Sequence, residues 1–231
     1  MIKQLAFAVS SLAFAASVHA ADQYIFGLSG SNSNNHLTLN GTTRLGFADQ
    51  GWYYQDGTHT PSIPNYIAGV CTSCALAGEY RNWFAFDISH VREPVSSVML
   101  TLYSYSAALT SGNYYLNDFN GSVSSLEAGT GGVNAFNDLG TGVNYGFRFF
   151  HSATDSNTFF DYALNAGAVN SINAAIGRGD AQWAIGGSFS AGDVPVPPSS
   201  RVPEPETIAL LGLGMVGLVA SRRTLAKTKN A

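Results

Sequence analysis

The sequence predicts a mainly β protein: an antiparallel β-sandwich of jelly-roll type with one short helix, followed by a C-terminal transmembrane helix. Three observations support this prediction. Apolar and polar residues alternate in several short segments bounded by Gly, Asn and Ser, which is typical of strands in a sandwich. One segment repeats its apolar residues every four positions instead. A third segment, near the C-terminus, is uncharged over the 15 residues 207–221.

The N-terminus has the three parts of a secretory signal peptide. Met1 to Lys3 is basic, Leu5 to Val18 is apolar, and Val18-His19-Ala20 is a small-residue cleavage site. We expect cleavage after Ala20, with Ala21 as the alternative. Residues 1–20 are therefore predicted to be a signal peptide, and residues 21–191 an exported domain.

Several strands are predicted within residues 21–191. In Ser96–Ser106, Val98, Leu100 and Leu102 share one face, while Met99, Thr101 and Tyr103 share the other. Three further segments read as strands: Asn82–Ser89, with aromatic residues on both faces, Asn113–Phe119 and Tyr145–Phe150. Together they predict the sandwich.

The predicted helix lies in the segment 161–180. Its apolar face contains Leu164, Ala168, Ile172 and Ile176, one residue in every four. Gly177 is expected to end it, because glycine readily adopts the left-handed conformation that closes helices.

A proline-rich linker and a membrane segment follow. Residues 192–206 contain five prolines and predict a semi-rigid extended spacer. Residues 207–221 would span roughly 22 Å as a helix, which is short for a hydrocarbon core of about 30 Å. Arg222 and Arg223 can snorkel to the interface, so we expect residues 222–231 to stay cytoplasmic. The alternative is a buried core helix, which the three glycines in the segment disfavour.

The composition of residues 21–191 excludes one class of partner. Five arginines and no lysine stand against twelve Asp and Glu, a formal net charge of −7. Binding to phosphate backbones needs clustered cations. We therefore expect no nucleic acid partner, whereas neutral sugars and cations stay compatible.

Cys71 and Cys74 are the two cysteines of the chain. Their C-x-x-C spacing also occurs in redox sites and zinc ribbons. A redox site would need a helix in a βαβ context, and zinc would need two further ligands, and neither is found nearby. In an exported chain a short-loop disulfide is favoured.

Candidate ligand-binding aromatics lie in the segment "GWYYQDG". If it is a strand, at least one of Trp52, Tyr53 and Tyr54 is exposed and could stack on a sugar ring. The competing interpretation is that alternate rings fill the core.

No catalytic or metal site is predicted. His36, His59, His90 and His151 have no metal-binding spacing, and no G-x-S-x-G motif occurs. Asp87 and Asp118 are interpreted as solvent-facing or turn-capping. We expect no cofactor. Calcium is a weak alternative, because jelly rolls often carry it on loop carboxylates, but no D-x-D-x-D-G loop is present.

The ending resembles the PEP-CTERM sorting signal of exported bacterial proteins. Val202-Pro203-Glu204-Pro205 precedes the apolar segment, and Arg222-Arg223 follows it. The resemblance implies a membrane-anchored precursor that exosortase, a membrane-embedded cysteine transpeptidase, cuts near Pro-Glu-Pro. It also implies a final location at the cell surface or in the extracellular matrix, and we expect a Gram-negative producer.

Residues 80–190 resemble a recurring ectodomain of PEP-CTERM proteins. The matching segments are "YRNWFAFDIS", "EPVSSVMLTLYSYS", "NDLGTGVNYGFRFF" and "LNAGAVNSINAAI...WAIGGSFS". The first two also resemble strands of carbohydrate-binding jelly rolls. This resemblance implies a fold and a location, but the ectodomain family has no activity that can be transferred to this chain.

Three functional hypotheses follow. The favoured one is a non-enzymatic surface or matrix protein associated with the exopolysaccharide of a biofilm. The second is a carbohydrate-binding module that uses exposed aromatics. The third is a glycan hydrolase with a carboxylate pair that meets only in space.

Overall fold

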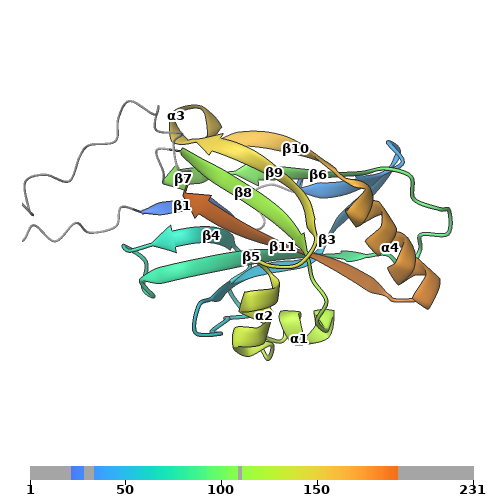
Figure 1. Cartoon of the computed structure of the whole chain (residues 1–231), viewed down its shortest axis with the longest axis horizontal. Coiled ribbons are helices and arrows are strands. Elements are labelled where there is room, and N and C mark those ends of the chain that lie inside the picture. Colours follow the sequence, from blue (N-terminus) through green and yellow to red (C-terminus); the bar gives the residue numbers. More distant parts are fainter. Residues whose placement is uncertain (1–21, 29–33, 109–110, 192–231) are drawn as a thin grey trace, which may run out of the picture. The chain divides into compact units, whose positions relative to one another are not determined.

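The computed structural model describes residues 22–28, 34–108 and 111–191, all within the first of the chain's two units, Met1–Gly192 (Figure 1). The strands are β1 Gln23–Gly27, β2 His36–Leu39, β3 Thr43–Tyr54, β4 Tyr66–Cys71, β5 Gly78–Asp87, β6 Val98–Ser104, β7 Ser106–Ala108, β8 Ser111–Asp118, β9 Asn144–His151, β10 Thr158–Leu164 and β11 Gln182–Ala191. The helices are α1 Val123–Glu127, α2 Gly132–Asp138, α3 Ser152–Asp155 and α4 Ala166–Arg178. The prediction of a mainly β, antiparallel fold is confirmed.

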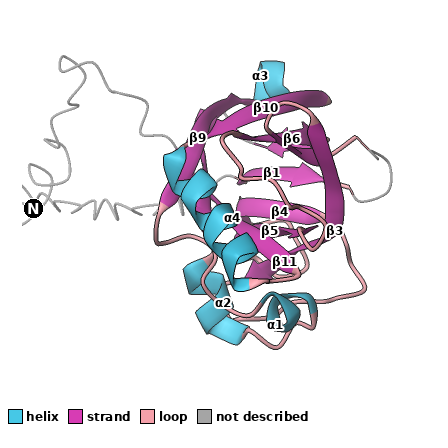
Figure 2. Ribbon diagram, turned by 90° about the vertical axis from the view of Figure 1, so that its right-hand side faces the viewer, coloured by secondary structure: helices cyan, strands magenta, loops and turns pink. Residues whose placement is uncertain are grey.

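The strands form two layers that β3 joins. The order along the sheet is β10-β6-β2-β3-β5-β11-β8-β9, with β4, β1 and β7 attached to one side. Residues 43–46 of β3 pair with β2, whereas residues 47–54 pair with β5. A register shift between Phe47 and Asp49 lies next to this change of partner. A bulge of this kind bends a strand, which allows β3 to pass from one layer to the other. Figure 2 shows the two layers, with α4 beside them.

Successive strands cross between the layers. The chain passes from β5 to β6, from β6 to β8, from β9 to β10 and from β10 to β11, changing layer each time. Crossings of this kind occur in Greek keys and jelly rolls.

The main core lies between the layers, and the predicted alternation builds it. In β6, Val98, Leu100 and Leu102 are buried, as predicted, while Met99 is exposed. The three buried residues pack with residues of the facing layer, among them Phe84 and Leu116.

The predicted helix is α4, with corrected ends. Asn165 caps its start, accepting a hydrogen bond from the Gly167 backbone N–H. The prediction that Gly177 ends the helix is wrong. Gly179 is the C-cap, with φ of 77°, and Leu164 belongs to β10. Ala168 and Ile172 are buried as predicted.

Three further helices were not predicted. The helices α1, α2 and α3 have 5, 7 and 4 residues, too short to show a helical repeat. Leu126 of α1 and Phe136 of α2 pack on Tyr53 and Trp83 of the sheet, so tertiary contacts stabilise these helices.

One edge of β5 is shared by two strands that diverge. Its residues 78–80 pair with β4, whereas residues 82–87 pair with β11. Beyond that point β4 continues beside β1, and β11 continues beside β8. A fork therefore opens between β4 and β11.

Within the described part of the chain, no helix has both the length and the apolar character needed to cross a membrane. The predicted signal peptide 1–20, linker 192–206, transmembrane segment 207–221 and basic tail 222–231 lie outside the described residues.

Candidate functional site

An aromatic cluster gathers around the C-terminal end of β3 and the two cysteines. Because strand residues alternate between faces, Trp52 and Tyr54 lie on one face of β3 and Tyr53 on the other. Trp52 packs edge-on against Tyr80, with ring centroids 5.2 Å apart, and Tyr54 lies 5.2 Å from the same ring. We call the group formed by Trp52, Tyr54, Tyr80 and the two cysteines the disulfide cluster.

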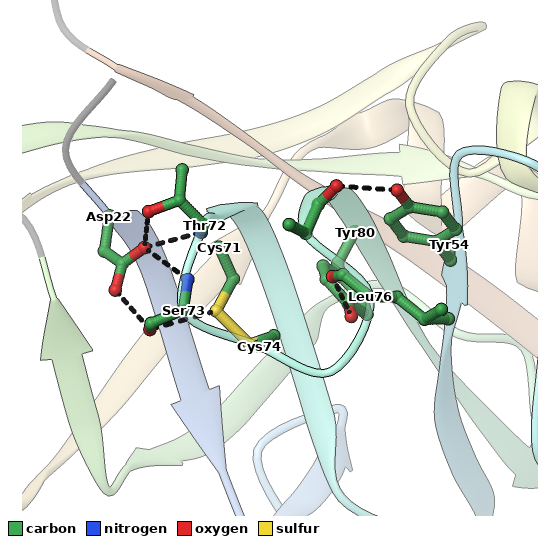
Figure 3. Close-up of a disulfide and its surroundings, with 9 residues drawn as sticks. Asp22, Tyr54, Cys71, Thr72, Ser73, Cys74, Leu76 and Tyr80 are labelled. Atoms are coloured by element: carbon green, nitrogen blue, oxygen red, sulfur yellow. Dashed lines mark hydrogen bonds between the residues drawn. A yellow bond between two sulfur atoms is a disulfide. The ribbon is translucent and has the colours of Figure 1, made fainter. Parts of the chain in front are cut away.

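Cys71 and Cys74 form a disulfide at the end of β4, with their Cα atoms 5.5 Å apart (Figure 3). Hydrogen bonds hold the chain both within the disulfide loop and just after it. On one side, Oδ1 of Asp22 accepts hydrogen bonds from the backbone N–H groups of Thr72 and Ser73. On the other, the Tyr80 hydroxyl donates to the carbonyl of Leu76 at 2.6 Å. The disulfide therefore belongs to a rigid structural loop.

The Asp22 carboxylate is electrostatically unusual for an exposed group. Hydrogen bonds from the hydroxyl of Ser73, then from the hydroxyl and backbone of Thr72, lower the pKa of Asp22 to about 2. Donors to the ionised carboxylate favour that form. Asp22 therefore stays ionised well below the pH at which an ordinary aspartate takes up a proton.

The disulfide cluster borders a small cavity of about 270 Å³, lined mainly by Tyr24, Phe26, Trp52 and Ile67. The Trp52 indole N–H donates to Oδ1 of Asn65 at 2.9 Å. Only 8% of Trp52 is exposed. Trp52 lines the cavity, but so little of it is exposed that no open ring face is left for a sugar.

Tyr53 is fully buried on the opposite face. Its hydroxyl donates to the carbonyl of Leu126 at 3.0 Å and accepts from the Gly131 N–H at 3.3 Å. The His59 ring stacks on it, with centroids 5.0 Å apart. Burial raises the pKa of Tyr53, and desolvation lowers that of His59.

The burial of Trp52 and Tyr53 favours the interpretation that rings of the Trp-Tyr-Tyr segment fill the core over the one in which they stack on sugars. A strand exposes alternate residues only where one face is open, and here both faces are covered. The other members of the disulfide cluster pack on Trp52, while α1 and α2 cover Tyr53. Tyr54 is partly buried, and its hydroxyl donates to the carbonyl of Ala77 at 2.7 Å.

The two singled-out carboxylates hold turns. Asp87 accepts a hydrogen bond from the Ser89 N–H at 2.9 Å, and hydrogen bonds from the side chain and then the backbone of Ser89 lower the pKa of Asp87. Asp118 is 9% exposed and accepts from the Val143 N–H at 2.8 Å and from the Asn120 amide at 2.9 Å. Among the described residues, no three His, Cys, Asp or Glu side chains gather in a way that could hold a metal ion.

The sequence did not predict that Asp22 binds the disulfide loop or that Asn65 binds the Trp52 indole. Asp22 binds a loop 50 residues away, and no local pattern signals such a contact.

The sorting residues Val202, Pro203, Glu204, Pro205, Arg222 and Arg223 lie outside the described residues. A comparison with protein families does cover them. Residues 201–223 match the PEP-CTERM protein-sorting motif. The comparison with curated proteins gives no match for this chain.

The family match contains the Pro-Glu-Pro tripeptide, the apolar segment and the arginine pair, in that order. This order confirms the resemblance that the sequence carries. The chain therefore carries a PEP-CTERM protein-sorting motif over residues 201–223, which supports its export and its recognition as an exosortase substrate.

Proposed function

We propose that this PEP-CTERM protein is a non-enzymatic component of the cell surface or extracellular matrix, attached to or embedded in extracellular polysaccharide. The observation that carries the proposal is the sorting motif at residues 201–223. Such a motif delivers a folded domain to the outside of the cell. The domain delivered here is a β-structure with one short-loop disulfide among its described residues.

The prolines and the arginine pair of the motif have different roles. Proline lacks a backbone N–H and forces the preceding residue into an extended conformation, so Pro203 and Pro205 keep this strip out of any helix. An extended strip at the membrane face suits the active site of a transpeptidase. The arginine pair holds the apolar segment with its C-terminal end in the cytoplasm.

The charge of the exported domain supports the polysaccharide partner. Residues 21–191 contain no lysine, and their formal charge is −7. Such a domain is repelled by phosphate-rich polymers, because both carry negative charge. A largely neutral polysaccharide does not repel it.

The proposal is tested by intact-mass analysis of the protein from its native cells and from cells that lack the sorting transpeptidase. We expect a mature form that begins near Ala21 and ends between Pro203 and Glu206, only where the transpeptidase is present. A double substitution, Pro203→Ala with Pro205→Ala, is expected to block this cut. The matched control is Pro197→Ala with Pro198→Ala, which changes the linker outside the motif.

Retention of residues 207–231 in both strains would contradict sorting by cleavage, and the ending would then act only as an anchor. Matrix association is tested separately by fractionation. The mature protein is expected in the polysaccharide fraction and to be released by digestion of the polysaccharide. Recovery in the culture fluid alone would contradict the matrix role.

A further inference from the structure

We propose that the groove at the fork between β4 and β11 binds a neutral polysaccharide chain. This inference rests on the proposed function and locates the contact with the polysaccharide. The groove has a volume of about 570 Å³, and Glu79, Arg81, Tyr115, Asn117 and Ser188 are among its lining residues. We call it the fork groove.

The fork groove exists because α1 and α2 cover only part of the outer face of the layer. They pack on Trp83, Ala85 and Ala184. Farther along the same strands the face continues without a helix over it, up to the point where β4 and β11 diverge. An open depression built on paired strands can hold an extended ligand.

Tyr115 lines the fork groove, and the aromatic surface continues from it to Phe147 on the neighbouring strand. Ser188, Tyr115 and Phe147 occupy neighbouring positions across β11, β8 and β9, and therefore share a face. The Tyr115 and Phe147 rings are 5.9 Å apart and tilted by 35°. The next row of the same face contains Asn113 and Phe149.

These rings are exposed to an extent that a monomeric surface rarely shows without a reason. Phe147 is 65% exposed and Phe149 is 49% exposed. Adjacent open rings offer flat apolar surfaces at low cost in conformational entropy. The C–H groups on the face of a sugar ring pack well on such surfaces.

The opposite wall is polar and held in place. Arg81 donates through Nε to Glu79 at 3.0 Å and through Nη1 to the carbonyls of Phe136 and Asn137 at 2.9 and 3.0 Å. Its guanidinium group also lies 4.2 Å from the Phe136 ring centroid. A Cβ on Gly140 would come within 2.4 Å of Arg81 Cζ, so glycine allows the loop to pack on this group.

The ion pair of Glu79 and Arg81 presents both hydrogen-bond acceptors and donors, and its two charges cancel. Of the described residues that line the fork groove, Glu79 and Arg81 are the charged ones. Their side chains are 36% and 16% exposed. Sugar hydroxyls can donate to the carboxylate and accept from the guanidinium group, whereas a strongly charged ligand would meet one unfavourable partner.

The floor adds small polar groups. The Asn117 amide donates to the hydroxyl of Ser188 at 3.3 Å. Aromatic rings for sugar faces, fixed polar groups for hydroxyls and the absence of a net charge together fit a neutral sugar chain better than a peptide or a polyanion.

The test measures binding of the full chain, purified in a detergent without a sugar headgroup. The probes are the exopolysaccharide of the producing strain and neutral hexasaccharides of β-1,4-glucan, β-1,4-xylan and α-1,4-glucan. We expect binding to at least one probe. Raising the salt concentration to about 0.5 M, far above the physiological value, should leave the binding unchanged because the site carries no net charge. Tyr115→Ala and Phe147→Ala should each weaken it by about tenfold or more.

Phe159→Ala is the matched control. Phe159 is 39% exposed and packs on Tyr103 at a ring distance of 4.9 Å, but it lies on β10 in the other layer. Its loss should leave binding unchanged. Because Phe147 is so exposed, Phe147→Ala should fold normally, which keeps the test valid even if Tyr115→Ala is unstable.

Three results would overturn the fork groove as a neutral polysaccharide site. Binding that Phe147→Ala leaves intact would place the contact elsewhere, while matrix association would stand. Binding that salt abolishes would indicate a charged ligand. Binding to none of the probes, by a protein that is still cut and sorted, would remove the polysaccharide contact and leave the sorting intact.

Discussion

The Asp22 carboxylate fixes Thr72 across 50 residues of sequence, with Oδ1 lying 2.6 Å from its backbone nitrogen and 2.7 Å from its hydroxyl. Thr72 lies between the two cysteines. The start of β1 and the disulfide loop are therefore tied together by a carboxylate as well as by strand pairing with β4.

This contact predicts an acid sensitivity. The pKa of Asp22 is about 2 in the folded protein against an ordinary value of 3.8, so the unfolded chain takes up the proton first as the pH falls. The stabilisation is complete above about pH 4 and is lost as the pH falls toward 2. Asp22→Asn should lower the melting temperature at pH 6 and flatten its decline between pH 4 and 2.

Glu93→Gln is the control for this experiment, because Glu93 is an exposed carboxylate. It should keep the wild-type acid profile. An Asp22→Asn profile with the wild-type slope would show that the contact does not contribute to acid stability.

The disulfide predicts a modest loss on reduction. It closes a loop of only a few residues, because the cysteines are three positions apart, and chain-entropy arguments give about 2 kcal/mol for so short a loop. Cys71→Ser with Cys74→Ser should lower the free energy of unfolding by about this amount in urea titrations. Reductant should lower wild-type stability to the same level and leave the double variant unchanged. An equal midpoint for wild type and variant would contradict the prediction.

The parts of the fold that could be predicted are those with a long local signal. The β6 alternation of Val98, Leu100 and Leu102 identified a strand with one buried face, and the four-residue repeat of α4 identified a helix. The end of α4 was misplaced because Gly177 and Gly179 are equally suitable by residue type. Only the backbone conformation at Gly179, with φ of 77°, distinguishes them.

The site was harder to predict because its contacts are distant in sequence. That Trp52 and Tyr53 lie on opposite faces follows from their adjacency in a strand. That the face of Tyr53 is covered depends on α1 and α2, whose Leu126 and Phe136 lie more than 70 residues beyond β3. The face of Trp52 is covered by residues of β4 and β5 instead. The aromatic row of Tyr115 and Phe147 forms only when β8 and β9 pair.

His59 predicts a second pH effect, near neutrality. Its Nδ1 is 2.7 Å from the Trp52 carbonyl, and desolvation lowers its pKa below 6.5, despite the opposing effects of that hydrogen bond and of Asp49. The unfolded chain therefore takes up a proton before the folded protein does. Stability should decline as the pH falls from about 7 to 5.

The measurement is the free energy of unfolding in urea at pH 7.5 and 5.5. His59→Gln should remove most of the difference between the two values. His90→Gln, at an exposed position, should retain it. A difference that survives in His59→Gln would assign the effect to another group.

Tyr53→Phe isolates one buried hydroxyl. The substitution keeps the ring that stacks on His59 but leaves the Gly131 N–H without its acceptor. A lost buried hydrogen bond with one partner left unsatisfied costs about 1–3 kcal/mol. Urea titration should show that loss, whereas Tyr105→Phe, at a ring 47% exposed, should change stability by less than about 0.5 kcal/mol. Equal effects of the two would contradict the role of this contact in seating α1 and α2.

Trp52→Ala distinguishes a core residue from a sugar-stacking residue. The Trp52 ring is 8% exposed, packs on Tyr80 and bonds to Asn65. Removing a buried tryptophan typically costs about 3–5 kcal/mol, so the variant should lose that much stability in urea. Phe147→Ala, at a ring 65% exposed, should lose little stability and instead lose polysaccharide binding. The opposite result, a stable Trp52→Ala protein with weakened binding, would return the sugar contact to the Trp-Tyr-Tyr segment and remove it from the fork groove.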